Sequence, residues 1–165
     1  MALTKLNNNS LHAITDGSAL QNATGGILQV KTGSHSSELN ATIGSWVDTG
    51  LSLSITPSST SSKILALYVM QFRLQGTGSN DPGMGFRLLR GSTVLESPGT
   101  TYDNYTYAQG NYIDHRGSDT EFYLDSPATT SAVTYKVQVN AYNGSTIRVQ
   151  SDGNRSRIML LEIAG

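Results

Sequence analysis

The sequence predicts an all-β fold, an antiparallel β-sandwich or jelly roll with an extended N-terminal arm. Ser, Thr, Asn and Gly account for 67 of the 165 residues. These residues disfavour helices, because their side chains compete for backbone hydrogen bonds or, in Gly, leave the backbone too free. Several segments alternate apolar and polar residues with the period of two that marks a strand. Turn residues separate these segments at the spacing of sandwiches and jelly rolls.

The clearest pair of strands lies between residues 51 and 70. Residues 51–56 alternate between aliphatic side chains and Ser or Thr, which places the aliphatic ones on one face of a sheet. Pro57 ends this strand because it has no N–H to donate, and residues 58–62 form a polar turn. Residues 64–70 are apolar at every position, so we expect a central strand covered on both faces.

The other strands follow from the same signals. Gly91 marks one hairpin, and Asn143 with Gly144 marks another, because that dipeptide suits the positive φ of a tight turn. Residues 97–119 are a long polar, tyrosine-rich section, and Trp46 is expected to anchor the sandwich. We expect strands at residues 27–32, 42–47, 51–56, 63–74, 84–90, 93–96, 121–124, 133–141, 146–150 and 156–163. The side chains expected in the core are Leu53, Ile55, Leu65, Leu67, Phe86, Val137 and Val139.

Two parts of the chain differ in character. Residues 27–165 form the sandwich domain, whereas residues 1–26 space their apolar side chains irregularly between Asn- and Gly-rich stretches. This composition fits a disordered tail or an arm that becomes ordered on a partner. Fully extended, 26 residues reach at most ~90 Å, far enough to cross onto a neighbouring subunit. The side chains expected to bind that partner are Leu3, Leu6, Leu11, Ile14 and Leu20.

Bulk composition argues against several classes of protein. The net charge is −1, and the Lys and Arg residues are scattered, so we expect no nucleic-acid partner. There is no Cys, and therefore no disulfide framework or thiolate metal site. The longest apolar run, residues 64–70, is far short of the ~20 residues that span a bilayer. The N-terminus lacks the apolar core of a signal peptide, so we expect no membrane partner and synthesis in a cytoplasm.

Candidate catalytic groups are weak, and we expect no enzyme activity and no cofactor. None of the three histidines has metal-ligand spacing to another. Residues 114–119 include the residue types of a hydrolytic triad, Asp, His and Ser, but a triad normally brings its groups together from distant segments. A glycosidase would need two acids facing each other in a cleft, and nothing in the sequence pairs any two of the candidates. Those acids are Glu96, Asp103, Glu121 and Asp125.

Tyrosine is concentrated in one place, where four tyrosines fall within eleven residues. Tyrosine flanked by Asn and Asp makes adaptable recognition surfaces. The alternative is a subunit interface at which each hydroxyl stays hydrated. The candidate receptor or interface residues are Tyr102, Tyr105, Tyr107 and Tyr112.

Four segments resemble a known group of proteins. They are Leu28 to Val30, the run from Ser45 to Leu65 (which contains Ser-Trp-Val-Asp-Thr-Gly-Leu-Ser and Ile-Thr-Pro-Ser-Ser), Phe86 to Thr93, and Leu160 to Ile163. Together they resemble small β-sandwich structural proteins of tailed-bacteriophage virions. That group includes head decoration or cement proteins and tail-fibre-type modules with a tumour-necrosis-factor-like jelly roll. The resemblance covers roughly residues 27–163.

The resemblance implies a virion protein that is made in the host bacterial cytoplasm and works as a homotrimer. The role we expect is capsid decoration, in which the protein binds the major capsid protein and stabilises contacts between capsomers. The chain lacks the long shaft repeats of a fibre, which favours this role. The alternative is a short tail-fibre or receptor-binding module that contacts other tail proteins or a host surface glycan. A carbohydrate-binding or glycan-cleaving module would need acids and aromatics converging in a concave site.

Overall fold

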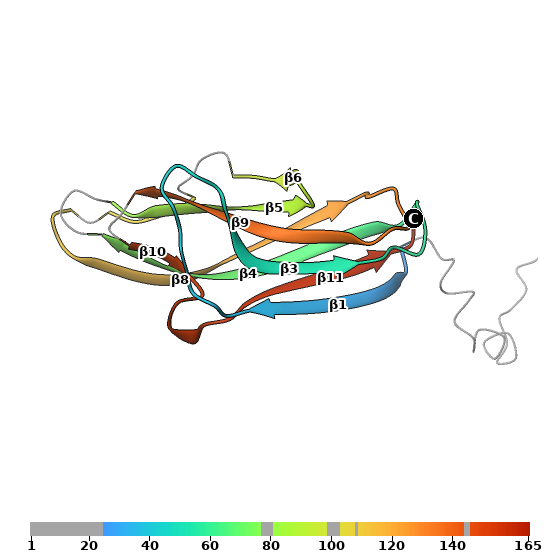
Figure 1. Ribbon diagram of the computed structural model, residues 1–165, viewed down its shortest axis with the longest axis horizontal. Helices are drawn as coiled ribbons and strands as arrows, with labels where there is room; N and C mark the ends of the chain where they lie inside the picture. Colours follow the sequence, from blue (N-terminus) through green and yellow to red (C-terminus); the bar gives the residue numbers. More distant parts are fainter. Residues whose placement is uncertain (1–24, 77–80, 99–102, 108, 144–145) are drawn as a thin grey trace, which may run out of the picture.

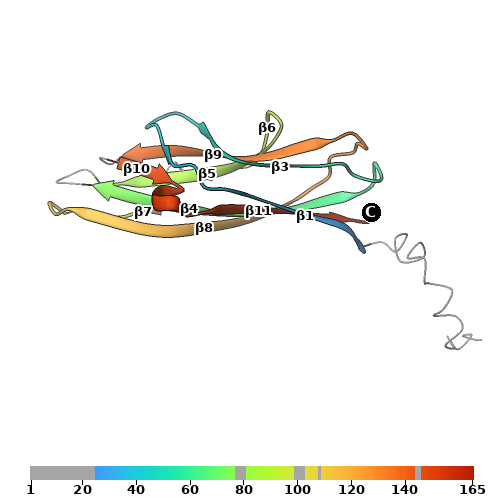
Figure 2. The ribbon, with the colours of Figure 1, turned by 60° about the horizontal axis from the view of Figure 1, so that its bottom comes forward.

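The computed structural model describes residues 25–76, 81–98, 103–107, 109–143 and 146–165. Two antiparallel sheets lie face to face, as Figures 1 and 2 show. The prediction of an all-β sandwich is therefore confirmed. The five apolar arm residues and Tyr102 lie outside the described residues. In the part of the chain described here, no helix is long and apolar enough to cross a membrane.

The first sheet is built around one long strand, β4. On one side β4 pairs with β8 along its whole length, and on the other it pairs first with β11 and then with β10. Its strands are β1 (Ile27–His35), β2 (Leu39–Asn40), β4 (Lys63–Gly76), β8 (Ile113–Asp125), β10 (Thr146–Val149) and β11 (Ser156–Ile163). A 3-10 turn, η1 (Ser151–Gly153), connects the last two.

The second sheet has the order β3-β9-β5-β6, with β7 paired to the start of β5. Gly91 takes a φ of 58° at the β5–β6 turn, so the hairpin expected there forms. The strands are β3 (Val47–Ile55), β5 (Gly83–Arg90), β6 (Thr93–Glu96), β7 (Asn104–Tyr105) and β9 (Val133–Asn143).

The core lies between the two sheets. In β4 every second side chain, from Ile64 to Leu74, is buried there. The second sheet contributes four of the expected core residues, Ile55, Phe86, Val137 and Val139, and all four are buried. Burying one such side chain is worth about 1.5–3 kcal/mol.

Three expected core residues lie elsewhere. Leu53 is only half-buried and packs at the margin of the core. Leu65 and Leu67 belong to the other face of β4 and are half-buried on the outside of the first sheet. The expectation that β4 is covered on both faces is therefore wrong within the described chain. A continuous apolar run gives no signal of which face is left open.

Strand boundaries differ from expectation at two places. β8 begins at Ile113 rather than at residue 121, so part of the polar, tyrosine-rich section is strand. β8 is an edge strand with exposed side chains on both faces, and it therefore lacks an alternating pattern. Residues 42–47 form no separate strand. Ile43 makes a single bridge to Ala141, and β3 runs from Val47 through Gly50.

Two further expectations are corrected. Asn143 ends a strand of the second sheet, whereas β10 belongs to the first sheet. The chain therefore crosses between sheets at this point instead of forming a hairpin. Trp46 is half-buried outside the core, and its ring lies 4.5 Å from the guanidinium carbon of Arg87. It packs on a cation rather than anchoring the sandwich.

Candidate interaction surface

The outer face of the first sheet is divided into an apolar half and a charged half. The apolar half lies on the part of β4 nearer the C-terminus, where β1, β11, β4 and β8 run side by side (Figure 1). Strand register places its side chains in three rows. The first row is Val30, Leu161, Leu65 and Leu124. The second is Thr32, Met159, Leu67 and Phe122. The third is Ser34, Arg157, Val69 and Thr120.

Eight aliphatic, Met or Phe side chains of these rows form what we call the apolar half-face. Its most exposed member is Phe122, at 70%, and three others are 40% exposed or more. Large contiguous apolar patches are rare on monomeric soluble proteins and mark sites of interaction. The members are Val30, Leu65, Leu67, Val69, Phe122, Leu124, Met159 and Leu161.

A shallow groove of about 270 Å³ lies in this face. It runs across β1, β11, β4 and β8 where Val69 and Thr120, two short side chains, follow the larger Leu67 and Phe122. Met159 and Arg157 of β11 also line it. The surface is therefore both apolar and hollowed.

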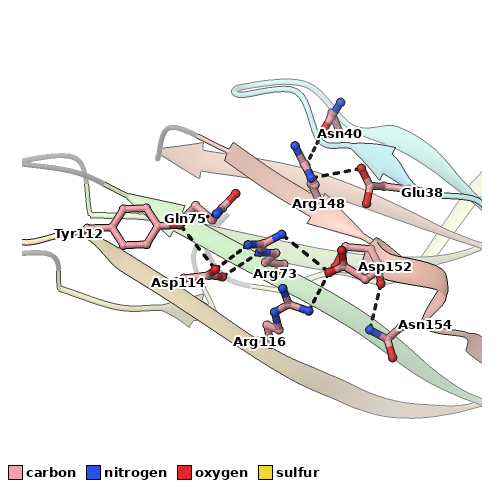
Figure 3. Close-up of polar contacts among 11 residues, drawn as sticks. Glu38, Asn40, Arg73, Gln75, Tyr112, Asp114, Arg116, Arg148, Asp152 and Asn154 are labelled. Carbon is pink, nitrogen blue, oxygen red and sulfur yellow. Dashed lines mark hydrogen bonds and ion pairs between the residues drawn. The ribbon is translucent and has the colours of Figure 1, made fainter.

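The charged half-face lies toward the other end of β4, and Figure 3 shows its polar contacts. Arg148, Arg73 and Arg116 form one cross-strand row on β10, β4 and β8. Arg73 donates two hydrogen bonds to Asp114, of 2.8 Å from Nε and 2.5 Å from Nη2. The hydrogen bond from Arg73 lowers the pKa of Asp114 below its usual range. Burial acts in the opposite direction but does not cancel this lowering.

The other two arginines of this row also have acidic partners. Arg116 lies 2.7 Å from the Asp152 carboxylate, and Arg148 lies 3.4 Å from the Glu38 carboxylate. The three guanidinium groups are thus matched by three acids of the same chain. These three arginines therefore do not need a negatively charged partner molecule to balance their charge.

Three of the four segments that carry the resemblance meet at one point, which we call the turn latch. The buried Glu162 carboxylate accepts hydrogen bonds from the Ser58 N–H and Oγ, both of 2.6 Å, and from Gln29 Nε2 at 2.5 Å. Burial alone would raise the pKa of Glu162, but these hydrogen bonds together hold it below its usual value. Gln29 also donates to the Thr56 carbonyl. These hydrogen bonds therefore tie the turn after β3 to β1 and β11, beside a pocket of about 470 Å³ that Gln29, Ser58 and Glu162 help to line.

A buried ion pair connects the two sheets. Arg90 Nη1 of β5 donates to both Asp125 carboxylate oxygens of β8, at 2.9 and 2.7 Å. The Tyr135 hydroxyl donates to the same carboxylate at 2.6 Å. Burial and this hydrogen bond to Asp125 raise the pKa of Tyr135 far above its usual value. Asp125, one of the acids considered for glycoside cleavage, is thus engaged in cross-sheet contacts.

The remaining candidate acids lie near one another along β6, β7 and β8. Burial raises the pKa of Glu121, and the charges of Asp119, Glu96 and Asp103 raise it further. Burial also raises the pKa of Asp119. Among the described residues, no group of three or more His, Asp or Glu side chains is arranged to hold a metal ion.

The triad-like run from Asp114 to Asp119 is split by the strand geometry. Asp114 lies on the outer face, bonded to Arg73, whereas a Cβ at Gly117 would meet the core side chain Phe72 at 2.6 Å. Successive residues of a strand point to opposite faces. The acid, imidazole and hydroxyl of this run therefore do not converge.

Two of the four candidate tyrosines lie together. The Tyr105 and Tyr107 rings are 5.1 Å apart and edge-to-face, and Tyr105 donates a 3.0 Å hydrogen bond to Asp81. Tyr142 joins them, with its ring 6.3 Å from that of Tyr105. Sequence spacing could not reveal Tyr142, because the register of β5 with β7 and β9 brings it there. Burial, together with Asp81, raises the pKa of Tyr105 to about 12.

Tyr112 does not join this aromatic group. Its hydroxyl accepts a 2.6 Å hydrogen bond from Gln75 Nε2 at the margin of the charged half-face (Figure 3). The aromatic group lies near β7, at the end of the sandwich opposite the C-terminus (Figure 2). The tyrosines expected to form one surface thus belong to two.

No family model matches the chain, and no curated protein matches its sequence. Among solved structures it is similar to the infectious bursal disease virus VP2 subviral particle, with a TM-score of 0.44 and 12% identity over 82% of this chain and 32% of that chain. The structure of the Gx strain of that virus gives a TM-score of 0.40 and 9% identity over 85% and 39%. The T13 viral particle gives 0.39 and 10% over 82% and 35%.

The chain thus spans about a third of the length of these solved chains, all of them from virus particles. With TM-scores below 0.5 and identities near 10%, the similarity defines neither a family nor a function. None of the three comes from a tailed bacteriophage. The resemblance to phage virion proteins therefore stays a prediction.

Proposed function

We propose that the chain is a non-enzymatic structural protein of a virus particle, a capsid decoration or cement protein that assembles as a homotrimer and binds the major capsid protein. The observation that carries this proposal is the apolar half-face. A protein that acts alone in water gains nothing from an exposed Phe and several exposed aliphatic side chains on a flat sheet. A subunit of an assembly buries them.

The turn latch supports the same proposal from another direction. The segments that resemble phage virion proteins supply Gln29, Ser58 and Glu162, which hold one turn of the sandwich in place. The resemblance therefore falls on residues with a structural task in this fold. The sandwich resists unfolding through such contacts without any Cys.

The alternative role, a short tail-fibre or receptor-binding module, is favoured by one feature. The rings of Tyr105, Tyr107 and Tyr142 are exposed, from 36% to 65%, at the end of the sandwich remote from the residue where the arm joins. Exposed tyrosines with a nearby carboxylate suit recognition of a polar ligand. In this role the arm would attach to other tail proteins and the tyrosines would meet a host surface glycan.

Removal of the arm tests the capsid role. Gly25 and Gly26 exchange backbone hydrogen bonds with Ala164, so the deletion should end at residue 24. We expect the truncated domain to melt as cooperatively as the full chain, because the core lies in residues 27–165, but to lose binding to undecorated heads of the virus that encodes it. Co-sedimentation with heads and a thermal melt measure the two properties.

A full-length variant with Ser in place of Leu3, Leu6, Leu11, Ile14 and Leu20 is the matched control. It keeps the length of the arm and removes its apolar contacts, each worth ~1.5–3 kcal/mol when buried. Loss of head binding in this variant supports docking by these side chains. Full binding by the truncated domain would remove the arm from the mechanism. Failure of the unaltered chain to bind heads would favour the tail.

A further inference from the structure

We propose that Phe122 of one copy inserts into the groove of the apolar half-face of a second copy. This inference deepens the proposed homo-oligomer by naming its contact. Phe122 lies on the edge strand β8, directly opposite Leu67, and is 70% exposed. A large and mostly exposed aromatic ring is the kind of side chain that anchors an interface.

The groove has the size and lining for such a ring. It measures about 270 Å³ and is lined by Thr32, Leu67, Val69, Thr120 and Met159 among others. A closed apolar cavity of about 150 Å³ already binds benzene, so an open groove of this size admits a phenyl ring. Phe122 adjoins the groove but does not fill it within its own chain, since most of its surface is exposed.

A second copy is the occupant that fits the shape of this face. The arginines of the neighbouring charged half-face are already matched by Asp114, Asp152 and Glu38. Arg157 also lines the groove, and a guanidinium is attracted to the face of an aromatic ring. The projecting ring and the groove also lie on the same face. In a rotationally symmetric oligomer every copy can then contribute one ring and accept one.

Photo-crosslinking tests the contact without removing the ring. A p-benzoylphenylalanine at position 122 keeps an aromatic group there, and a mixture of ¹⁵N-labelled and unlabelled chains distinguishes links between copies from links within one. We expect crosslinked peptides that pair one labelled and one unlabelled chain and that map to Thr32, Leu67, Val69 or Met159. Crosslinks confined to single chains, or to residues outside the groove, would overturn the inference.

Sedimentation gives a second, independent readout. We expect the unaltered protein at micromolar concentration to have a multiple of its 17.6 kDa chain mass, and Phe122→Ala to reduce that mass to a single chain. Val69→Trp, which fills the groove, should act in the same way. Val94→Ala removes an exposed apolar side chain from the other sheet and should leave the mass unchanged. Circular dichroism confirms that each variant is folded.

The outcomes separate this inference from the proposed function. If Phe122→Ala and Val69→Trp are folded and keep the oligomeric mass, or if the unaltered chain sediments as 17.6 kDa, the proposed contact is wrong. If the contact is found but the protein binds no heads, the contact stands and the capsid role fails.

Discussion

Replacement of Asp125 by Ala should destabilise the protein by about 3 kcal/mol, the low end of the range for removing one partner of a buried ion pair. The Asp125 carboxylate accepts hydrogen bonds from Arg90 and Tyr135 and is almost fully buried. Its loss leaves a guanidinium and a hydroxyl between the sheets without their acceptor. The low end applies because the Arg90 side chain is 26% exposed and can recruit water.

Urea unfolding of Asp125→Ala, Tyr135→Phe and the double variant measures this effect. Tyr135→Phe removes only one neutral donor and should cost about 1–2 kcal/mol, less than Asp125→Ala. The double variant should cost less than the sum of the two, because both single changes disrupt the same contact. Additive losses, or a loss below about 1 kcal/mol for Asp125→Ala, would contradict the role of this ion pair in joining the sheets.

Replacement of Glu162 by Gln should destabilise the protein by about 2–3 kcal/mol, because hydrogen bonds to a charged group are worth about 1.5–3 kcal/mol each. The neutral amide keeps the size of the side chain but can no longer accept from both Ser58 and Gln29 through two oxygens. For a domain of this length the loss corresponds to a fall in Tm of roughly 4–12 °C. Differential scanning calorimetry at pH 7 measures it.

The effect of Glu162→Gln should depend on pH. The pKa of Glu162 is lower in the folded protein than its usual value of 4.5. Its ionised form therefore stabilises the fold above that value, and this stability is lost as the pH falls through the folded-state pKa. The gap in Tm between the two proteins should be widest at pH 7 and should narrow below about pH 4. A gap that is constant with pH would show that the carboxylate charge is not involved.

The sequence predicted the interior where a strand alternates between apolar and polar residues, and failed where a strand does not. Val137 and Val139 alternate with polar residues on β9, and their burial follows from that pattern. β8 has no such pattern, because it is an edge strand that pairs only with β4 and most of its side chains are not buried in the core. Its extent depends on pairing with β4, a contact between residues 37 to 61 positions apart that local sequence does not encode.

The candidate surface was predictable only in part. Ile64 to Met70 is apolar throughout, and from this pattern we expected both faces of the strand to be covered. In the structure, the register of β8 and β11 brings Leu65 and Leu67 together with Phe122 on an open face. Arg73 and Asp114 pair across 41 residues for the same reason. The identity of such residues follows from the sequence, but their assembly into one surface depends on sheet register.

The number of copies in each particle tests the capsid role most directly. Particles of the virus that encodes this chain can be purified, and the chain can be quantified by mass spectrometry against the major capsid protein. A trimeric decoration protein bound across the shell should be present in on the order of hundreds of copies, since every trimer repeats the same docking contact. A handful of copies would place the protein in the tail, and its absence from particles would contradict a virion role altogether.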